Sequence, residues 1–395
     1  MRILYHHRTQ AEDGQAIHIR AMIDAFESLG HEVAEVSLVK RTAAREGRAR
    51  GQAAEQGSNW GWVTRLPRFA RELAEYGYNG LARHTLMKEA TFFEPHFLYE
   101  RYAFGNAAGV LAARRLRRPM VLEVNSPMVV ELEKTRGLSF PRLARRVEDF
   151  VFQSADRVCA VTEVLAEMLV RQGVERERIL VTPNGVDLER YTVEDRAAAK
   201  QSARRRLGLP TGQGRAPLVL GFVGYCRPWH RLDVCLRALE HPDLQHAVLA
   251  LIGEGPAHEE LTRLADERNL SDRLFFCGSR PHAEIPELLH AFDVGLIPAI
   301  NPYASPLKLH EYMAASLPVI APDQPNLREV LTPERDALLV PAGDHQAMAA
   351  ALVRLGTDEA QRRRLGAAAR TTIEERNLTW RANARRVVAA MKEVT

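Results

Sequence analysis

Asn301-Pro-Tyr-Ala-Ser-Pro-Leu-Lys-Leu-His-Glu-Tyr-Met-Ala-Ala-Ser-Leu-Pro-Val-Ile320 has the order of a loop, a helix and a strand. The run before it, Val294–Pro298, predicts one buried strand, and Pro318–Ala321 predicts the next. Ser305 and Pro306 are predicted to be the N-cap and the first residue of the helix between them. A strand, a helix and a second strand in this order are typical of a parallel α/β sheet.

The start of this helix, which is predicted to end near Ser316, is a candidate site for an anion. Its first backbone N–H groups lack partners within the helix and carry the positive end of the macrodipole, which suits a phosphate or a diphosphate. Lys308 and Glu311 are three residues apart and therefore share one face, where they would meet the anion and a sugar hydroxyl. The alternative is an ordinary capped helix with a surface Lys–Glu pair, which these residues alone favour.

The size and composition of the chain indicate a globular protein of two domains. Its 395 residues exceed what one ordinary core covers, and 46% of them are apolar and 26% charged. Met1–Tyr5 leads directly into a strand, and no apolar run has the length of a bilayer-spanning helix. We therefore expect neither a signal peptide nor a membrane span, and a location in the cytoplasm or at the inner face of the membrane.

Charge and cysteine usage exclude several classes of protein. A net charge of +4 is mild for this length, so we expect no nucleic-acid partner. The four cysteines are far apart and form no C-x-x-C motif, which predicts buried free thiols and neither a metal site nor a disulfide framework. The sequence contains no P-loop, H-E-x-x-H or G-x-S-x-G motif and no Asp-x-Asp pair. No bound metal is expected.

Short apolar runs alternate with helical stretches through residues 1–190, which predicts a first Rossmann-like domain. The expected strands are Arg2–His6, His31–Val39, Phe97–Glu100, Met120–Val124, Arg157–Val161 and Ile179–Thr182. The expected helices are Ala16–Leu29, Asn106–Arg117, Arg142–Ala155 and Glu163–Gln172. In open α/β sheets the functional residues lie beyond the carboxyl ends of the strands. This rule selects His7, Arg8, Arg101, Glu123, Asn125, Thr162 and Asn184, each of which is alternatively a loop residue facing water.

An insertion at about 40–94 interrupts this alternation. Lys40–Asn59 is rich in Arg, Ala, Gly and Gln and predicts a flexible loop. Trp60–Lys88 predicts an amphipathic helix with basic flanks. Packing against its own domain is the favoured interpretation, and peripheral contact with an anionic membrane is the alternative.

A linker at 191–217, which begins with a charged helical segment and contains the Pro- and Gly-rich run Leu209–Pro217, separates the two halves. The alternation then restarts over 218–378, with a final helix at Trp380–Lys392 in the segment 379–395, which we expect to pack back on the first domain. The expected strands of the second half are Leu218–Val223, Ala247–Ile252, Arg273–Cys277, Val294–Pro298, Pro318–Ala321 and Ala337–Val340. The predicted fold class is α/β, with two Rossmann-like doubly wound domains facing each other across a cleft.

Three strand-to-helix turns of the second domain contain candidate ligand-binding residues. In the turn after Leu218–Val223, Gly224 permits close approach of a ligand. The cationic or donor groups of this turn are suited to bind a diphosphate; they are Arg227, His230 and Arg231. Gly253-Glu-Gly255 is a weak dinucleotide fingerprint, because His258 occupies the third glycine position. The motif is either a plain turn or a turn near a nucleotide, which Glu254 would contact. The third turn, which includes Arg280 and Pro281, is expected to shape a flat slot for a base.

These motifs together resemble the retaining, nucleotide-sugar-dependent glycosyltransferases of family 4, which have the GT-B architecture. The residues that carry the resemblance occur in the family's order over nearly the whole chain: Pro183-Asn-Gly-Val-Asp187, Gly224, Gly253-Glu-Gly255, Gly278 and Ser305-Pro-Leu-Lys-Leu-His-Glu-Tyr-Met-Ala314. His6-His-Arg-Thr-Gln10 and Glu123-Val-Asn-Ser-Pro127 are similar to bacterial members that build exopolysaccharide or other surface glycans.

The resemblance implies donor binding mainly by the second domain and acceptor binding by the first. The implied catalytic residues are Lys308, Glu311, Asn125 and Glu123. The implied donor-binding residues are Gly14, Gly224, Arg227, His230, Arg231, Glu254, Arg280, Pro281, Ser305, Pro306 and Leu307. The implied acceptor-side residues are His7, Arg8, Arg101, Thr162 and Asn184.

The chain departs from the family pattern at several of these positions. Tyr303 replaces the first glutamate of the Glu-x7-Glu element, and Ser316 replaces a glycine. Tyr225 and His230 occupy the positions of the phosphate-clamping Arg and Lys, and Asn125 replaces a histidine found in many relatives. Lys308, Arg227 and Arg231 are therefore the residues expected to supply positive charge.

The implied activity is transfer of a hexosyl unit, with retention, from a UDP- or GDP-sugar to a glycan, lipid-linked or small-molecule acceptor in surface polysaccharide biosynthesis. The nucleotide sugar is a co-substrate, and no tightly bound cofactor is expected. A nucleotide-sugar epimerase of the same fold, an NAD-dependent oxidoreductase and an inactive sugar-binding paralogue are the alternatives.

Overall fold

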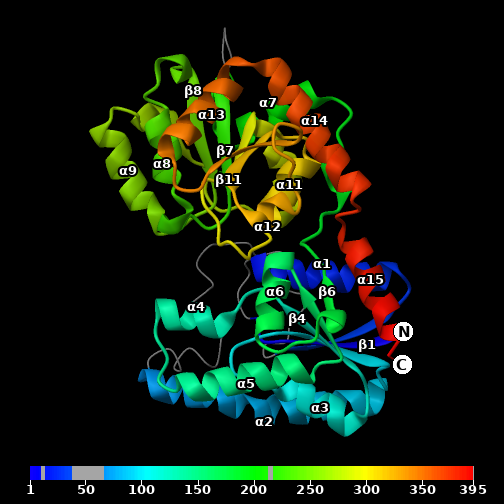
Figure 1. Ribbon diagram of the computed structural model, residues 1–395. Helices are drawn as coiled ribbons and strands as arrows, with labels where there is room; N and C mark the ends of the chain where they lie inside the picture. The colour runs from blue at the N-terminus through cyan, green and yellow to red at the C-terminus, as the bar shows by residue number, and fades with distance from the viewer. Residues whose placement is uncertain (10–13, 38–65, 212–216, 395) are drawn as a thin grey trace. The chain divides into compact units, whose positions relative to one another are not determined.

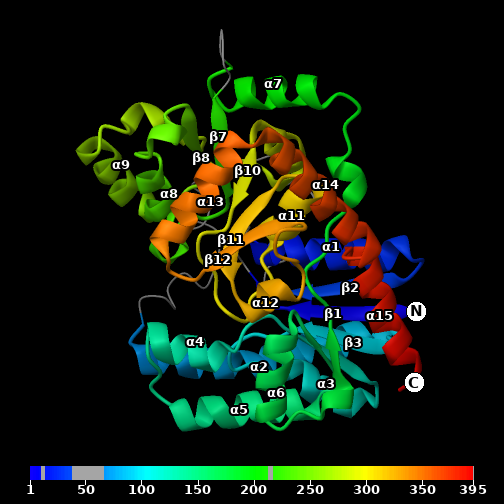
Figure 2. The same ribbon diagram turned by 45° about the horizontal axis from the view of Figure 1, so that its top comes forward.

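The computed structural model describes residues 1–9, 14–37, 66–211 and 217–394, and the structural statements that follow concern those residues. They form two compact units (Figures 1 and 2). Unit 1 contains Met1–Pro183 and Trp380–Thr395, and unit 2 contains Asn184–Thr379.

In the described part of unit 1, parallel strands form one sheet in the order β2-β1-β3-β4-β5-β6. The strands are β1 (Arg2–His7), β2 (Glu32–Ser37), β3 (Phe97–Arg101), β4 (Met120–Val124), β5 (Arg157–Ala160) and β6 (Ile179–Val181). β3 and β4 are buried along their whole length, as expected for a parallel sheet with helices on both faces. The order reverses between β1 and β3, so the carboxyl ends of these two strands form a topological switch point.

The helices of unit 1 cover both faces of this sheet. They are α1 (Gly14–Ser28), α2 (Arg68–Phe93), α3 (Ala108–Leu116), α4 (Met128–Thr135), α5 (Pro141–Ser154), α6 (Glu163–Arg171) and α15 (Trp380–Lys392). α2 packs on α3, and the C-terminal helix α15 packs on α1. Figures 1 and 2 show α2, α3 and α5 on the face of the sheet opposite α1. The sequence pattern did not predict α4.

α2 differs from the helix predicted at Trp60–Lys88. It begins at Arg68 and continues to Phe93, while the predicted loop Lys40–Asn59 and residues 60–65 lie outside the described residues. α2 connects β2 to β3 across the sheet, so it is a crossover helix of the fold and not an insertion. Its inner face includes Tyr78, Ala82 and Leu86.

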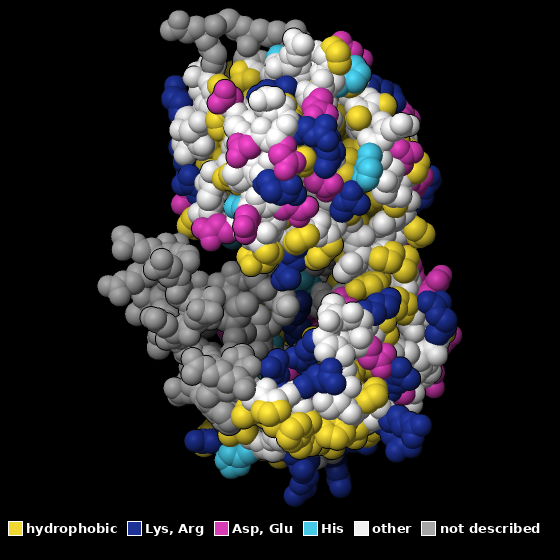
Figure 3. Space-filling model, turned by 90° about the vertical axis from the view of Figure 1, so that its left-hand side faces the viewer, with side chains coloured by type: hydrophobic (Ala, Val, Ile, Leu, Met, Phe, Trp, Pro, Cys, Tyr) yellow, Lys and Arg dark blue, Asp and Glu magenta, His cyan; other side chains and the backbone are white. Residues whose placement is uncertain are grey.

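The outer face of α2 and the neighbouring α5 leave several large apolar side chains exposed. On α2 they are Phe69, Leu73, Leu81 and Phe92. On α5 they are Leu143 and Phe150, and Phe140 directly precedes that helix. Figure 3 shows apolar side chains beside Lys and Arg side chains along the lower edge of unit 1. None of the described helices combines the length and the apolar character needed to cross a bilayer.

The described part of unit 2 contains a second parallel sheet, in the order β12-β11-β10-β7-β8-β9. Its strands are β7 (Leu218–Val223), β8 (Ala247–Ile252), β9 (Leu274–Phe276), β10 (Val294–Leu296), β11 (Val319–Asp323) and β12 (Ala337–Pro341), each at a predicted position. The switch point lies between β7 and β10, which pair through Leu220 and Val294. The fold class of two Rossmann-like α/β domains is therefore confirmed.

Helices of unit 2 pack on both faces of this sheet. They are α7 (Arg196–Arg206), α8 (Leu232–Ala238), α9 (Ala257–Glu267), α10 (Ile285–Leu288), α11 (Leu307–Ala314), α12 (Pro325–Arg328), α13 (His345–Thr357) and α14 (Glu359–Glu375). The fully buried Tyr312 of α11 accepts a hydrogen bond through its hydroxyl oxygen from Val223 N–H at 2.9 Å. This bond ties the helix of the opening stretch to the end of β7. All four cysteines are buried and free, as predicted.

The boundary between the two compact units lies a few residues before the predicted domain limit. The chain passes from unit 1 to unit 2 at Pro183–Asn184 and not at residue 190. The predicted linker 191–217 includes α7, whose Arg204 is buried and donates to the Ala291 carbonyl at 3.0 Å and to Asp293 at 2.7 Å. These contacts make α7 part of unit 2. A charged, Ala-rich segment does not reveal such partners locally, because they lie almost 90 residues away.

Candidate functional site

Lys308 lies at the start of α11, next to the turn that follows β7. Its Nζ atom is 3.7 Å from the centroid of the Phe222 ring. A Cβ atom at Gly224 would lie 3.1 Å from Nζ, and Gly224 has a φ of +129°, so a glycine keeps this space open. Burial lowers the pKa of Lys308 to about 7, although Cys226 and Glu311 act in the opposite direction. A desolvated ammonium of this kind is well suited to bind an anion.

The first turn of α11 differs in one respect from the prediction. Pro306 occupies the cap position, and no side chain caps the helix. Ser305 is not the N-cap, because its Oγ accepts a hydrogen bond from the Asn184 N–H at 3.1 Å and its carbonyl accepts one from Asn184 Nδ2. The helix start at Leu307 therefore has no side-chain acceptor of its own, as an anion site requires.

Ser316 stands where the family pattern predicts a glycine, and its backbone conformation fits that expectation. Its φ is +55°, the left-handed conformation that favours glycine. Its hydroxyl accepts a hydrogen bond from Arg196 at 2.7 Å.

The turn after β7 brings two of its three predicted cationic groups toward Lys308. His230 is buried, contacts the Phe222 ring and accepts a hydrogen bond from Arg227 N–H at 3.1 Å. Burial, together with the charges of Lys308 and Arg227, lowers the pKa of His230 to about 3. His230 is therefore neutral near pH 7. Arg231 is instead engaged by Asp233 at 3.0 Å and by His345 at 3.1 Å.

The Gly253-Glu-Gly255 turn has a structural reason for its glycines. A Cβ atom at Gly253 would lie 2.1 Å from the Gly224 carbonyl oxygen, and Gly253 N–H donates to the Gly278 carbonyl at 2.9 Å. The carbonyl of Glu254 accepts from Cys226 N–H at 2.7 Å, while the residue is otherwise exposed. Close packing of three neighbouring turns therefore explains the motif without a dinucleotide.

Glu311 is held by two side chains from distant parts of unit 2. His282 Nε2 lies 2.7 Å from its Oε1 atom. The Tyr191 hydroxyl also forms a hydrogen bond with Glu311. Burial and the charge of Glu311 raise the pKa of Tyr191. Sequence reasoning did not select either side chain: no motif marks Tyr191, and His282 follows the predicted turn residues Arg280 and Pro281. Arg280 and Pro281 are exposed, and Arg280 donates to the Cys277 carbonyl at 3.2 Å.

Glu123 is the centre of a buried network in unit 1. Its carboxylate accepts hydrogen bonds from Tyr99 at 2.7 Å, from Arg101 and from Asn125, and it pairs with His18 at 3.1 Å. Burial opposes ionisation, but His18 and Arg101 outweigh it and lower the pKa of Glu123. With 1% of its surface exposed, Glu123 is placed to hold its neighbours in position. Its predicted catalytic role stays a prediction.

The remaining residues predicted for the first domain have different environments. His7 is buried and lies 2.9 Å from Glu35, while Thr162 caps α6 by accepting from Leu165 N–H at 3.1 Å. Asn184, which was predicted on the acceptor side, is the first residue of unit 2. Gly14 is the exposed first residue of α1, and Arg8 is half-buried at the end of β1.

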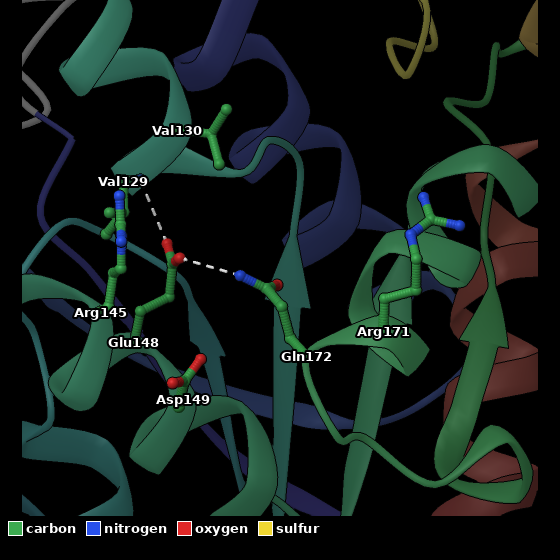
Figure 4. A pocket seen from close by; sticks show the side chains of 7 residues that line it. All are labelled: Val129, Val130, Arg145, Glu148, Asp149, Arg171 and Gln172. Atoms are coloured by element: carbon green, nitrogen blue, oxygen red, sulfur yellow. Dashed lines mark hydrogen bonds between the residues drawn. The ribbon is translucent and has the colours of Figure 1, made fainter.

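Two cavities lie in unit 1, away from these residues. One of about 320 Å³ is lined by residues of α4 and α5 and by the end of α6 (Figure 4): Val129, Val130, Arg145, Glu148, Asp149, Arg171 and Gln172. Glu148 accepts hydrogen bonds there from Val129 N–H and Gln172, both at 3.2 Å, and burial raises its pKa. The other, of about 410 Å³, lies beside Arg114, Arg117 and Arg118. Neither includes a strand-end residue predicted for the site.

Comparisons with known proteins identify the family of the chain. Residues 211–372 match the model of the glycosyl transferases group 1, and residues 13–190 match that of Glycosyltransferase Family 4. The D-inositol 3-phosphate glycosyltransferase of Xylanimonas cellulosilytica is 32% identical, over 72% of this chain and 68% of the relative. That of Thermomonospora curvata is 32% identical, over 77% of this chain and 73% of the relative.

Solved structures show the same fold. Anabaena Alr3699/HepE in complex with UDP has a TM-score of 0.72 at 17% identity, covering 100% of both chains. Sucrose-phosphate synthase from Thermosynechococcus elongatus has a TM-score of 0.74 at 20% identity, covering 100% of this chain and 99% of its own. WaaG, a glycosyltransferase involved in lipopolysaccharide biosynthesis, has a TM-score of 0.68 at 15% identity, covering 99% of this chain and 98% of its own.

Two parallel Rossmann-like sheets, each with helices on both faces, define the GT-B fold. The chain belongs to glycosyltransferase family 4. It is accordingly a retaining, metal-independent hexosyltransferase that uses a nucleotide sugar. Neither the epimerase nor the oxidoreductase alternative has comparable support, since the Gly253–Gly255 turn on which the latter depended is explained by packing.

Proposed function

We propose that this enzyme transfers a hexosyl unit from a UDP-sugar to a hydroxyl group of a phosphorylated or lipid-linked acceptor in the synthesis of surface glycans. Binding of the nucleotide sugar is supported by one observation. The ammonium of Lys308 is desolvated beside Gly224, at the start of α11, which no side chain caps. A uridine nucleotide is favoured over a guanosine nucleotide because Alr3699/HepE has been solved in complex with UDP and with UDP-glucose.

The acceptor class rests on similar proteins. The relatives that match most of the chain are D-inositol 3-phosphate glycosyltransferases, which supports a phosphorylated small-molecule acceptor. WaaG and the lipopolysaccharide outer core galactosyltransferase WaaB share the fold, which supports a surface-glycan acceptor.

The residues of unit 2 have distinct proposed roles in this reaction. In the transition state positive charge develops on the sugar ring and negative charge on the departing diphosphate. Lys308, the N–H groups near Leu307 and Arg227 stabilise that diphosphate. Glu311, held by His282 and Tyr191, accepts hydrogen bonds from donor hydroxyls. His230 is neutral and adds no charge of its own.

The residues of unit 1 are proposed to serve the acceptor. Asn125, which Glu123 holds at the end of β4, is the proposed contact to the transferred sugar or to the acceptor hydroxyl. No residue of the proposed site is assigned as a covalent nucleophile. The proposed mechanism is therefore front-face transfer, in which the acceptor hydroxyl attacks the same face of the sugar that the diphosphate leaves. The leaving diphosphate assists this attack.

The donor is tested first, with UDP, GDP and ADP compared by thermal shift on the full chain. We expect UDP to raise the melting temperature most, and a larger shift with GDP would overturn the choice of base. Incubation with UDP-glucose and with phosphorylated polyols, analysed by mass spectrometry, then detects hexosyl transfer. Formation of a new nucleotide sugar without an acceptor would indicate an epimerase instead.

Peripheral membrane contact is part of the proposal. Phe69, Leu73 and Leu143 are exposed on α2 and α5, and Arg142 and Arg146 are exposed nearby on α5. Apolar side chains with basic neighbours favour an anionic lipid surface. We expect the protein to co-sediment with anionic vesicles at low salt and a Phe69→Ser/Leu73→Ser variant to do so less. Equal sedimentation of the two proteins would exclude this face as the contact.

A further inference from the structure

Arg8 is a half-buried cation at the switch point of the unit 1 sheet, directly after β1. Its Nη1 atom donates to the Phe104 carbonyl at 2.9 Å, and its guanidinium lies 4.6 Å from the centroid of the Tyr78 ring. Among the described residues, no carboxylate forms an ion pair with it within 4 Å. Arg101 and Arg136, by contrast, have such partners in Glu123 and Glu75.

The side chains around Arg8 are fixed by a buried network. His6 contacts Glu100 through Nδ1 and lies 3.3 Å from the Tyr78 hydroxyl through Nε2. Glu100 also accepts from Gly109 N–H at 3.0 Å. These contacts hold Tyr78 in place beneath the guanidinium. Arg8 is therefore positioned before any ligand binds, which reduces the entropy lost on binding.

The loop that receives the Arg8 hydrogen bond is held in the same way. Asn79 of α2 donates to the Gly105 carbonyl at 2.8 Å and accepts from Ala107 N–H at 2.6 Å. Around this loop, three buried polar atoms have no hydrogen-bond partner among the described residues: Tyr76 Oη, Asn106 Nδ2 and Glu100 Oε1. Buried polar groups are nearly always paired with protein, water or ligand. Two of the three are potential donors, as suits a ligand rich in acceptor oxygens.

Nearby acidic groups do not neutralise this cation directly. Glu75 and Glu100 act on Arg8 only at longer range. Glu75 is paired with Arg136 at 3.3 Å, and Glu100 is engaged by His6 and Gly109. Burial lowers the pKa of Arg8, an electrostatic cost that a bound anion offsets. A guanidinium binds phosphate oxygens in pairs, so a phosphate group is the ligand that this arrangement fits.

We propose that Arg8, placed by Tyr78 and the Phe104–Asn106 loop, binds a phosphate group of the acceptor and so selects phosphorylated acceptors. The inference rests on the proposed function, because it assigns the acceptor side of the same reaction. The phosphate belongs either to a free phosphorylated polyol or to a lipid, and the two sources present the same oxygens to Arg8.

The test compares wild type with Arg8→Gln, Arg8→Lys and Arg20→Gln, the last removing an exposed arginine of α1 in the same unit. Calorimetric titrations on the full chain use D-inositol 3-phosphate, myo-inositol and UDP, and vesicles containing phosphatidic acid represent the lipid-borne source. We expect Arg8→Gln to weaken binding of one phosphate probe at least about tenfold. UDP affinity and the melting temperature are expected to stay near wild type, with Arg8→Lys intermediate and Arg20→Gln unchanged.

The outcomes separate this inference from the proposed function. Equal affinity of wild type and Arg8→Gln for both phosphate probes overturns the role proposed for Arg8. So does a wild type that binds UDP but binds D-inositol 3-phosphate no better than myo-inositol, and vesicles with phosphatidic acid no better than vesicles without it. If Arg8→Gln does not fold, Arg8→Lys decides, since it keeps the charge but loses the paired hydrogen bonds. A wild type that binds no nucleotide overturns the proposed function itself.

Discussion

The Nζ atom of Lys308 lies 3.7 Å from the centroid of the Phe222 ring, beside the turn at Gly224. The face of an aromatic ring carries partial negative charge, so it compensates part of the cost of desolvating the ammonium. Among the described residues, no carboxylate within 4 Å completes that compensation. These surroundings support the proposed binding of a ligand anion at Lys308, which can be tested by mutation and by changes in pH.

Replacing Lys308 with Met is expected to lower kcat/KM by about 10²- to 10³-fold, the usual effect of removing a group that stabilises charge in a transition state. The melting temperature should stay at or above that of wild type, because the substitution removes a desolvated charge and keeps the apolar stem. Steady-state kinetics and thermal unfolding measure the two quantities. Arg263→Gln, which changes an exposed cation of α9, serves as the control. Wild-type kinetics in the Lys308 variant would remove this residue from the mechanism.

The affinity for UDP is expected to fall as the pH rises above 7. The pKa of Lys308 is lowered to about 7 in the free protein, so its ammonium loses its proton above that pH, whereas the charge on UDP is nearly constant from pH 7 to 9. Titration calorimetry at about pH 7, 8 and 9 measures the trend. The trend should disappear in Lys308→Met.

The same group affects the stability of the free enzyme in the opposite direction. Between about pH 7 and 10.5 the unfolded chain binds more protons at Lys308 than the folded chain does, so its contribution to the free energy of unfolding increases with pH. Denaturant unfolding of wild type and Lys308→Met across this window isolates the contribution. Parallel pH profiles of the two proteins would show that the pKa is not lowered.

Gly224→Ala is expected to weaken UDP binding by about tenfold or more, because the new methyl group lies 3.1 Å from the Lys308 ammonium and occupies space beside it. Its φ of +129° also predicts a loss of stability of about 1–3 kcal/mol. Gly343→Ala is the matched control, since Gly343 has a φ of +81° and no atom within 4 Å of the added Cβ. If the two variants bind UDP with equal affinity, the space beside Lys308 is not part of the UDP site.

Glu123→Gln is expected to destabilise the protein by about 3–5 kcal/mol, because it leaves the buried Arg101 without its carboxylate. The pKa of Glu123 is lowered in the folded state, so its stabilising contribution is present above about pH 4.5 and is lost as the pH falls below that value. The variant should therefore lose less stability than wild type in acid. Urea unfolding at pH 7 and pH 4 tests both statements.

An exposed pair provides the comparison for this variant. Glu334→Gln breaks the surface contact with Arg354 and should change the free energy of unfolding by less than about 1 kcal/mol. Comparable losses in the two variants would contradict the structural role assigned to Glu123.

The elements of this fold were largely predictable from local pattern. β4, β7 and β8 have the predicted bounds, because each is an apolar run bounded by residues that end a buried strand. The start of α11 was predicted to within one residue from Ser305 and Pro306. The placement of Lys308 beside the turn at Gly224 agrees with the rule that ligands bind at the carboxyl ends of parallel strands.

The partners of the functional side chains were not predictable in the same way. Ser305 bonds to Asn184, which is 121 positions away, and Glu311 lies next to His282 at a separation of 29. Arg231, which was predicted to bind the donor, is engaged by Asp233 and His345. Hydrogen bonds and ion pairs of this kind depend on which strand ends become neighbours, and periodicity along the chain carries no information about that.

By itself the sequence determined two parallel α/β units and a helix start suited to an anion, since apolar period, glycine turns and proline positions act over a few residues. Only the tertiary structure decided that Lys308 is desolvated over Phe222, that Glu123 is buried and that no carboxylate of the described residues pairs with Arg8. The physical reason is that burial and charge compensation depend on groups brought together by folding. A lysine or a glutamate in a sequence becomes a binding or a supporting residue only through those neighbours.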